Sequence, residues 1–502
     1  MVDEKKFGNN LIKDFLKLFD EHSIRNPAYA RMILHVILGQ ALKNIYFRQG
    51  ARRIDIRMHL LLIRPSGAGK GAGYGFFHGL ASDLGMDNQM LTEATDAGLA
   101  GSGGMNPRTG DIEINEGLMV NADFISMEEG STLFDYTSSF SKKNLTYLQI
   151  AMNPLADASC EISKKIGSIE DAIRFKPHCS FLILTYMPER FINALITRGV
   201  IQRFVTIIQA VTLDERLKVV DIGIDKLNIS TEDDFDEKYQ SVLARIKYVI
   251  NKYQKRGIPP ATTRYNLNKD VLTAGLNRAV GRKLDNDIIE KLTSSVEKTV
   301  DRLNNPDWSG YCFDISDKSK EEIRVVEHEL MNMINDTTPV AQEKLQEFTH
   351  RVLEQLIRFS IHHAILDLRE SVETQDVVYA RQVMLPIWQN VIYNLEDMLV
   401  AEREQRIRIN MVISGAVDMY HAMLTENNPK FVRKDNVGSI WVRRATLIKR
   451  LQPKWDNCSF ITANNRVMRL ETDKKGDTNK NKWFQRKKFG STLFVKLLQD
   501  IK

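Results

Sequence analysis

Cysteine is scarce in this sequence, with four residues among 502. Cys160, Cys179, Cys312 and Cys458 lie far apart and form no CxxC pair, so we expect reduced, mostly buried thiols and no disulfide framework. The ten histidines show no metal-ligand spacing either. His362 and His363 adjoin within a helical pattern, which favours one surface and one core residue over a pair of ligands. We therefore expect no zinc.

Long apolar runs are also absent. No stretch approaches the roughly 20 apolar residues that a membrane-spanning helix needs. Residues 1–10 are charged and polar, unlike the apolar core of a signal peptide. These absences predict a cytoplasmic protein without a membrane partner. With ordinary hydrophobic (43%) and charged (27%) content, a chain of 502 residues is expected to form two or three domains.

The net charge of +6 conceals an asymmetry. Residues 430–502 hold 19 Lys and Arg against 6 Asp and Glu, a net charge of +13, whereas the remainder holds 51 against 58, a net charge of −7. A basic tail on a mildly acidic body predicts that a polyanion binds near the C-terminal end. The alternative is an ordinary solvated basic surface.

Three short apolar segments predict the strands of an α/β sheet. Residues 10–48 first show helical spacing that continues to Ile45, which predicts a helical lead-in. Ile54–Ile63 then resembles one strand, and Phe124–Met127 and Phe181–Leu184 resemble two more, buried as central parallel strands are. Because polar residues follow each strand, we expect a site at the carboxyl edge of the sheet.

The rest of the chain is predicted to be mainly helical. Residues 105–121 alternate around the turn Asn106–Gly110, which predicts a β-hairpin. From about 205 to 345 the pattern is helical and charged, and 345–400 is strongly periodic. The tail from about 405 resembles a winged-helix module, with Trp441, Leu447, Ile448 and Leu451 as helical core positions. Its basic loop, expected to contact duplex or forked DNA, contains Lys474, Lys475, Lys480 and Lys482. A basic protein-interaction domain is the alternative.

A phosphate-binding loop is predicted directly after the first strand. Such a loop needs glycines whose N–H groups face phosphate oxygens, a lysine, and a Ser or Thr hydroxyl for Mg²⁺. Arg64 replaces the first glycine of the pattern, and Gly71 replaces the Ser or Thr. A plain glycine-rich turn is the alternative. The residues expected around the phosphates are Pro65, Ser66, Gly67, Ala68, Gly69, Lys70 and Gly71.

Two acids end the second strand. Chemistry at a γ-phosphate needs one carboxylate near Mg²⁺ and another that orients the attacking water. We assign the first role to Glu128, acting through water, and the second to Glu129. Glu128 stands where an Asp is usual and is one methylene longer. A pair of exposed acids at a helix start is the alternative.

The order of further motifs resembles one family. Gly98-Leu99-Ala100, Asn106–Asp111 and Glu116–Val120 precede the acidic strand, and Ile162–Gly167 follows it. Ala194–Ile196 through Gln202-Arg203-Phe204 comes next, and the helix Arg351–Arg358, continuing through Asp376-Val377, comes last. In this order the segments resemble the motor of the minichromosome-maintenance (MCM) helicases, a family of AAA+ ring ATPases. The likeness covers roughly 60–215 and 345–390, a little under half of the chain.

The resemblance implies a fold and a set of roles. It implies an α/β AAA+ core over 53–215, preceded by a helical region over 1–52. A helical insertion and lid over 216–400 and the winged-helix-like, basic DNA-binding domain over 401–502 follow. Arg203, with Arg198 as a weaker candidate, and Arg351 would act in trans, and Thr185 would stand in for the sensor Asn because Met187 aligns there. Arg108, Lys164 and Lys165 would contact DNA from two hairpins.

The function implied is that of an ATP- and Mg²⁺-dependent helicase. It would act as a homo-oligomeric ring, expected to be a hexamer, on single-stranded or forked DNA at a nucleoid or host-cell replication site. No OB-fold or zinc-binding N-terminal domain precedes the core, which suggests a helicase of a mobile element or virus. Two alternatives stay open: an AAA+ initiator, loader or remodeller in which ATP is an assembly switch, and a ring scaffold without ATPase activity.

Overall fold

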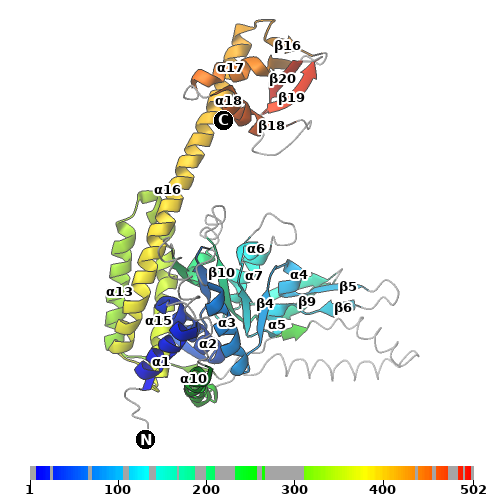
Figure 1. Ribbon diagram of the computed structural model, residues 1–502. Helices are drawn as coiled ribbons and strands as arrows, with labels where there is room; N and C mark the ends of the chain where they lie inside the picture. Colours follow the sequence, from blue (N-terminus) through cyan, green and yellow to red (C-terminus); the bar gives the residue numbers. More distant parts are fainter. Residues whose placement is uncertain are drawn as a thin grey trace, which may run out of the picture. The chain divides into compact units, whose positions relative to one another are not determined.

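The computed structural model shows two compact units, Met1–Glu396 and Asp397–Lys502, which we describe separately (Figure 1). Within the described residues, no helix is both long and apolar enough to cross a membrane. The described residues are 7–22, 26–65, 70–105, 112–134, 143–166, 169–186, 199–209, 232–256, 263–265, 310–435, 439–454, 459–472, 484–489 and 492–498.

A five-stranded, all-parallel sheet forms the centre of the first unit, so the fold is mixed α/β as predicted. The strands run in the order β11-β3-β10-β7-β4. β3, β7 and β11 are buried along their whole length, and so is β10, as strands covered on both faces should be. The strands are β3 (Leu60–Ile63), β4 (Asn88–Leu91), β7 (Phe124–Met127), β10 (Ser180–Thr185) and β11 (Val205–Ile208).

The register aligns the carboxyl ends of the central strands. Thr185 of β10 is paired with Ile63 of β3, and Ile183 of β10 is paired with Met127 of β7. The residues that follow β3, β7 and β10 therefore meet at one edge of the sheet. At the opposite edge, Val205 begins β11 beside Leu60, the first residue of β3.

Helices from both ends of the first unit pack around this sheet. α2 contacts β3, β10 and β11, and α1 contacts α2, α3, α10 and α15. Edge-to-face contacts of Phe19 with Tyr29 and Phe76 join α1 to α2 and α3, so the N-terminal helices belong to the same core. The helices are α1 (Phe7–His22), α2 (Pro27–Ala41), α3 (Lys70–Asp83), α10 (Glu232–Gln254) and α15 (Phe348–Leu366).

A second sheet corrects two predictions. Ile45 lies in a strand rather than on a helix, because β1 pairs with β2 and with the distant β13. The single strand predicted over Ile54–Ile63 is two strands in different sheets: β2 ends at Asp55, and β3 begins at Leu60. The strands of the second sheet are β1 (Ile45–Gln49), β2 (Arg52–Asp55) and β13 (Tyr311–Cys312).

Two hairpins lie beside the central sheet, to its right in Figure 1. β5 and β6 pair antiparallel on either side of the predicted turn, which itself lies outside the described residues. β8 and β9 pair antiparallel at the segment that resembles the family's second hairpin, and β12 adds to β9. The elements of this region are α4 (Asp96–Ala100), β5 (Ser102–Met105), β6 (Ile112–Asn115), α5 (Leu118–Asn121), α6 (Ser131–Phe134), α7 (Asn144–Ala151), β8 (Ile162–Ile166), β9 (Ile169–Phe175) and β12 (Thr263–Tyr265).

The later part of the first unit is helical, with short strands between the helices. The prediction of helix alone from 205 to 345 is therefore wrong for β11, β12, β13 and β14. β14 pairs with β15 although three helices lie between them in the chain, and this pairing ties the start of α13 to the start of α16. The remaining elements are the 3-10 helix η2 (Ile201–Arg203), β14 (Asp314–Ile315), α13 (Asp317–Asn335), α14 (Pro339–Leu345), β15 (Ser371–Val372) and α16 (Thr374–Glu426).

The second unit is a small α/β module with its own core. α17 and α18 pack on each other and α17 packs on β17 and β20, while the last turns of α16 share the core around Val442, Leu447 and Val467. Trp441 lies in β17, not on a helix as predicted, whereas Leu447 lies in α17. The sheet order is β16-β17-β20-β19-β18. The elements are β16 (Val432–Lys434), β17 (Ile440–Arg443), α17 (Arg444–Lys454), α18 (Phe460–Arg469), β18 (Glu471–Thr472), β19 (Phe484–Phe489) and β20 (Thr492–Leu497).

Candidate functional site

The carboxyl ends of β3, β7 and β10 bring together most of the described residues that the sequence singles out for phosphate chemistry. We call this set the phosphate edge: Lys70, Gly71, Glu128, Glu129 and Thr185. Pro65 follows β3, and Lys70 begins α3. Ser66, Gly67, Ala68 and Gly69 lie outside the described residues. Parallel α/β sheets bind ligands at this edge, since the loops after the strands converge there.

Lys70 and Glu129 form an ion pair at the phosphate edge. The Nζ atom of Lys70 donates to Oε1 of Glu129 at 3.2 Å. The lysine side chain is only 6% exposed, whereas the glutamate is 53% exposed. A buried ammonium needs a partner, and here the partner is a carboxylate on the solvent side. An anionic group that reached Lys70 would therefore compete with Glu129 for it.

Gly71 and Glu128 face each other. A Cβ atom added to Gly71 would lie 2.6 Å from Oε1 of Glu128, closer than real Cβ contacts come. Glu128 is exposed and has no hydrogen bond or ion pair with another residue in the described part of the chain. Carboxylate oxygens suit Mg²⁺, which proteins usually hold with one or two carboxylates plus phosphates and water. The donor set at this edge therefore fits Mg²⁺, although the usual hydroxyl is replaced by Gly71.

The end of β10 connects the two loops of the phosphate edge. The N–H of Arg64 donates to the carbonyl of Thr185 at 2.9 Å, and the N–H of Gly130 donates to the carbonyl of Leu184 at 2.7 Å. The hydroxyl of Thr185 donates to the carbonyl of Tyr186 at 3.2 Å, and the side chain is buried. Thr185 thus lies at the correct edge, with its hydroxyl used locally. Met187, the position aligned with the sensor Asn, lies outside the described residues.

A polar network beneath the phosphate edge was not predicted from the sequence. The hydroxyl of Tyr74 on α3 lies 3.0 Å from Oγ of Ser126, which donates to Oδ1 of Asn88 at 2.8 Å. These contacts fix α3 against β7 and β4. Ser126, a polar residue inside the apolar strand Phe124–Met127, was the only signal available, because its two partners are distant in sequence.

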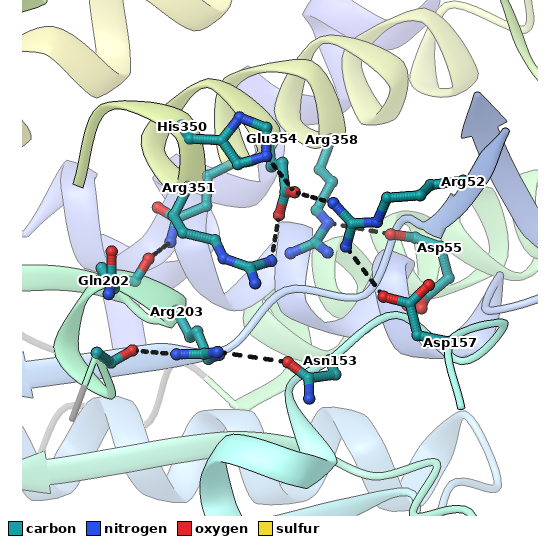
Figure 2. Close-up of polar contacts among 12 residues, drawn as sticks. Arg52, Asp55, Asn153, Asp157, Gln202, Arg203, His350, Arg351, Glu354 and Arg358 are labelled. Atoms are coloured by element: carbon teal, nitrogen blue, oxygen red, sulfur yellow. Dashed lines mark hydrogen bonds and ion pairs between the residues drawn. The ribbon is translucent and has the colours of Figure 1, made fainter. Parts of the chain in front are cut away.

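Arg203 and Arg351 lie near each other, as Figure 2 shows, and Arg203 directly precedes β11 at the edge of the sheet opposite to the phosphate edge. Arg203 ends η2, directly before β11, and donates to the carbonyl of Gly199 at 2.5 Å and to Asn153 at 3.5 Å. Burial, and then the positive charge of Arg351, lower the pKa of Arg203 to about 10. Neither guanidinium can easily serve the phosphate edge of its own chain, since the four residues of β3 alone span about 10 Å. Arg198 lies outside the described residues.

Glu354 pairs with two members of the arginine cluster of Figure 2, which we define as Arg52, Arg203, Arg351 and Arg358. Its carboxylate is only 2% exposed and accepts from Arg351 at 2.8 Å and from Arg52 at 3.5 Å. Burial raises the pKa of Glu354, but the charges of Arg358 and Arg351 outweigh burial and hold that pKa below its usual value. The lid-helix motif contains Arg351, Glu354 and Arg358, so the sequence did carry a signal for this cluster, whereas Arg52 was missed.

The side chains predicted to contact DNA are not among those described. Lys164 and Lys165 belong to β8, where Lys164 is in register with Ile173 of β9, and only their backbone is described. Arg108, Lys474, Lys475, Lys480 and Lys482 lie outside the described residues. In the second unit, the ammonium of Lys487 lies 5.5 Å from the ring centre of Trp441 and 5.1 Å from that of Phe489. β19 thus adds basic residues that the sequence reading did not single out.

Both members of the His362-His363 pair are buried, which corrects the expectation of one surface residue. The imidazole of His362 contacts the carbonyl of Ile56 at 3.0 Å. His363 is grouped with Asp367 and Asp376 closely enough to hold a metal ion. However, the guanidinium of Arg369 donates to both carboxylates and the imidazole of His363 contacts Asp376, so these groups already bind one another. We assign no metal to this group.

A scan against family models matches none to this chain, and no curated protein sequence matches it. Its function is therefore argued from the geometry of the phosphate edge and the arginine cluster.

Proposed function

We propose that this chain is a Mg²⁺-dependent P-loop ATPase of the AAA+ type that assembles into a ring on DNA, similar to the motor of the MCM helicases. One observation carries the proposal: Lys70, Glu128 and Glu129 converge at the carboxyl edge of a five-stranded parallel sheet. P-loop enzymes combine a lysine with acids in this arrangement to hold and hydrolyse a nucleoside triphosphate.

In this proposal the residues at the phosphate edge have different roles. Lys70 leaves Glu129 and holds the β- and γ-phosphate oxygens, and Glu129, once released, orients the attacking water. Glu128 would hold the Mg²⁺ ion. The bound ion neutralises charge on the phosphates. The backbone bonds from Arg64 and Gly130 to the end of β10 keep the two loops at a fixed separation.

The position of Arg203 and Arg351 supports a ring. Both lie at the edge opposite to Lys70, so their charge is most useful at the phosphate edge of a neighbouring subunit. In other P-loop enzymes an arginine supplied to the transferred phosphate contributes about 10³–10⁵-fold in rate. A head-to-tail contact that joins opposite faces of two subunits closes into a ring if the rotation permits. We infer a homo-oligomeric ring, with a hexamer as the expected form.

Nucleotide binding is the first test. We expect Lys70→Ala to abolish ATP binding and hydrolysis, because the phosphates lose their cation. Lys320→Ala, on the exposed face of α13, is the matched control and should bind ATP as the wild type does. Equilibrium binding with Mg²⁺ and phosphate release on forked DNA are the measurements. Equal binding by wild type and Lys70→Ala would contradict the proposal.

The two hairpins and the basic tail support DNA as the partner. Lys164 and Lys165 are near the turn of the β8–β9 hairpin, and residues 430–502 carry a net charge of +13. We expect the double variant Lys164→Ala/Lys165→Ala to weaken single-stranded DNA binding and to reduce the slope of log affinity against log salt by about 1.4, roughly 0.7 for each lysine. Fluorescence anisotropy over a KCl series measures the slope. An unchanged slope would show that this hairpin is not part of the DNA-binding surface.

A second candidate function is an initiator, loader or remodeller in which ATP controls assembly. Gly71 favours this candidate, because a P-loop without its hydroxyl is expected to turn over slowly. A strand-displacement assay on forked DNA separates the two: a helicase displaces the strand with ATP, whereas an assembly switch forms the ring with ATP but displaces nothing. Absence of any ATP binding would instead favour a scaffold.

A further inference from the structure

The two departures at the phosphate edge occupy the same space. Gly71 lacks the side chain that the P-loop pattern places there, and Glu128 is longer than the usual Asp. Oε1 of Glu128 lies 2.6 Å and its Cδ 3.6 Å from the position that a Cβ of residue 71 would take. A Ser or Thr at position 71 would therefore meet the carboxylate of Glu128. The absence of a side chain at Gly71 therefore leaves space for the longer side chain of Glu128.

The pair also preserves the chemistry of the position. A P-loop Ser or Thr offers Mg²⁺ one oxygen beside the phosphates, and an acid after the second strand offers carboxylate oxygens from further away. In this chain a carboxylate oxygen of Glu128 already lies where the side chain of residue 71 would begin. Oxygen donors are what Mg²⁺ requires, and a carboxylate serves as well as a hydroxyl.

We propose, on the basis of the proposed nucleotide function, that Glu128 replaces the missing P-loop hydroxyl as a direct Mg²⁺ ligand and that Gly71 is its steric complement. Glu129 is not placed for this role, because its carboxylate contacts Lys70, whereas the atoms nearest to position 71 belong to Glu128. Glu128, by contrast, is exposed and has no hydrogen bond or ion pair with another residue in the parts that the structure describes.

The replacement has a consequence for ligand binding. A hydroxyl is neutral, but a carboxylate is negative and repels phosphate oxygens until a cation lies between them. Nucleotide binding should therefore depend on Mg²⁺ more strongly than in a P-loop with a hydroxyl. We define the Mg²⁺ ratio as the nucleotide Kd in EDTA divided by the Kd in Mg²⁺.

The experiment measures ADP binding by equilibrium fluorescence with Mg²⁺ and with EDTA, and Mn²⁺ affinity in the presence of ADP by electron paramagnetic resonance. We expect Glu128→Gln to improve binding in EDTA and to reduce the Mg²⁺ ratio by about ten-fold, equivalent to ~1.4 kcal/mol. Glu128→Asp and Gly71→Ser should each weaken Mn²⁺ binding, the first by withdrawing the carboxylate and the second by displacing it.

The double variant Gly71→Ser/Glu128→Asp is the decisive one. It restores the usual hydroxyl and the usual acid, so its Mn²⁺ affinity should exceed that of either single variant. Gly79→Ser is the matched control on the same helix, because a Cβ there meets nothing within 4 Å. The atom that obstructs Gly71→Ser is the end of the Glu128 side chain, which can move aside. We therefore expect Gly71→Ser to unfold at the same temperature as the wild type.

Three outcomes are distinguishable. Recovery in the double variant together with a smaller Mg²⁺ ratio in Glu128→Gln supports the inference. Nucleotide binding by the wild type with an unchanged ratio in Glu128→Gln, or with additive losses in the double variant, overturns the inference alone. If the wild type binds no nucleotide under either condition, the inference and the proposed function both fail.

Discussion

At the scale of single residues, the carboxylate of Glu129 occupies the ammonium group of Lys70, to which the phosphates of the proposed nucleotide would bind. A nucleotide bound as we propose would have to displace Glu129 from Lys70, since the two side chains are 3.2 Å apart. We expect Glu129→Gln to bind ATP at least as tightly as the wild type, because a competitor for the lysine loses its charge. Hydrolysis should fall by about 10²–10⁴-fold, the usual contribution of a positioned base.

Equilibrium binding and single-turnover hydrolysis separate these two effects. Glu321→Gln is the control, since it removes an exposed acid whose ion pair, with Arg324, lies along α13. Undiminished hydrolysis by Glu129→Gln would show that another group orients the water.

Sequence reasoning identified the charged residues of the site more readily than their surroundings. Lys70, Glu128 and Glu129 follow apolar strands, and strand ends can be read from a single sequence. The contact between Gly71 and Glu128 could not be predicted, because it depends on the separation of two loops 57 residues apart in the chain. The partners of Ser126, Tyr74 and Asn88, were hidden for the same reason.

At the scale of elements, the start of α6 is pressed against β10. A Cβ added to Gly130 would lie 2.2 Å from Cγ2 of Ile183 and 3.3 Å from the carbonyl oxygen of Leu184. Since Ile183 is buried in the central sheet, Gly130→Ala is expected to destabilise the first unit by about 1–3 kcal/mol. Gly79→Ala, in open space on α3, should instead stabilise it by about 0.5–1 kcal/mol. Urea unfolding followed by circular dichroism measures both, and changes of the same sign would refute this view of α6.

Elements were predictable where their pattern is local. β7 begins and ends at the residues expected, and the β5–β6 hairpin surrounds its turn signal, whereas the β8–β9 hairpin was expected only from the family resemblance. The prediction failed at Ile45, whose spacing suits a helix but whose strand partner, Tyr311, is remote in the sequence. It also failed over Ile54–Ile63, where the chain passes from one sheet to another within ten residues whose pattern suits a single strand.

At the scale of the whole molecule, the buried positive charge of Arg203 lowers the stability of the folded chain. The pKa of Arg203 is lowered to about 10, well below the usual arginine value, first by burial and then by the positive charge of Arg351. The folded state therefore holds the proton less tightly than the unfolded chain does. This penalty is fully present below about pH 10 and is relieved only as the pH rises above about 10. Because the charged form of Arg203 lowers the stability of the folded chain, this residue is better explained by our proposal that it acts on a neighbouring subunit.

A mixing experiment tests that function. Lys70→Ala removes the phosphate lysine but keeps Arg203, and Arg203→Ala does the reverse, so we expect neither variant to hydrolyse ATP alone. In rings mixed at equal amounts, a head-to-tail interface unites an intact phosphate edge with an intact arginine in about a quarter of cases, and activity should return to that extent. The measurement is phosphate release as a function of the mixing ratio. Mixtures of Lys320→Ala with Arg203→Ala serve as the reference for subunit exchange. If both residues served the same subunit, no mixture would recover activity, because every subunit would still lack one of them.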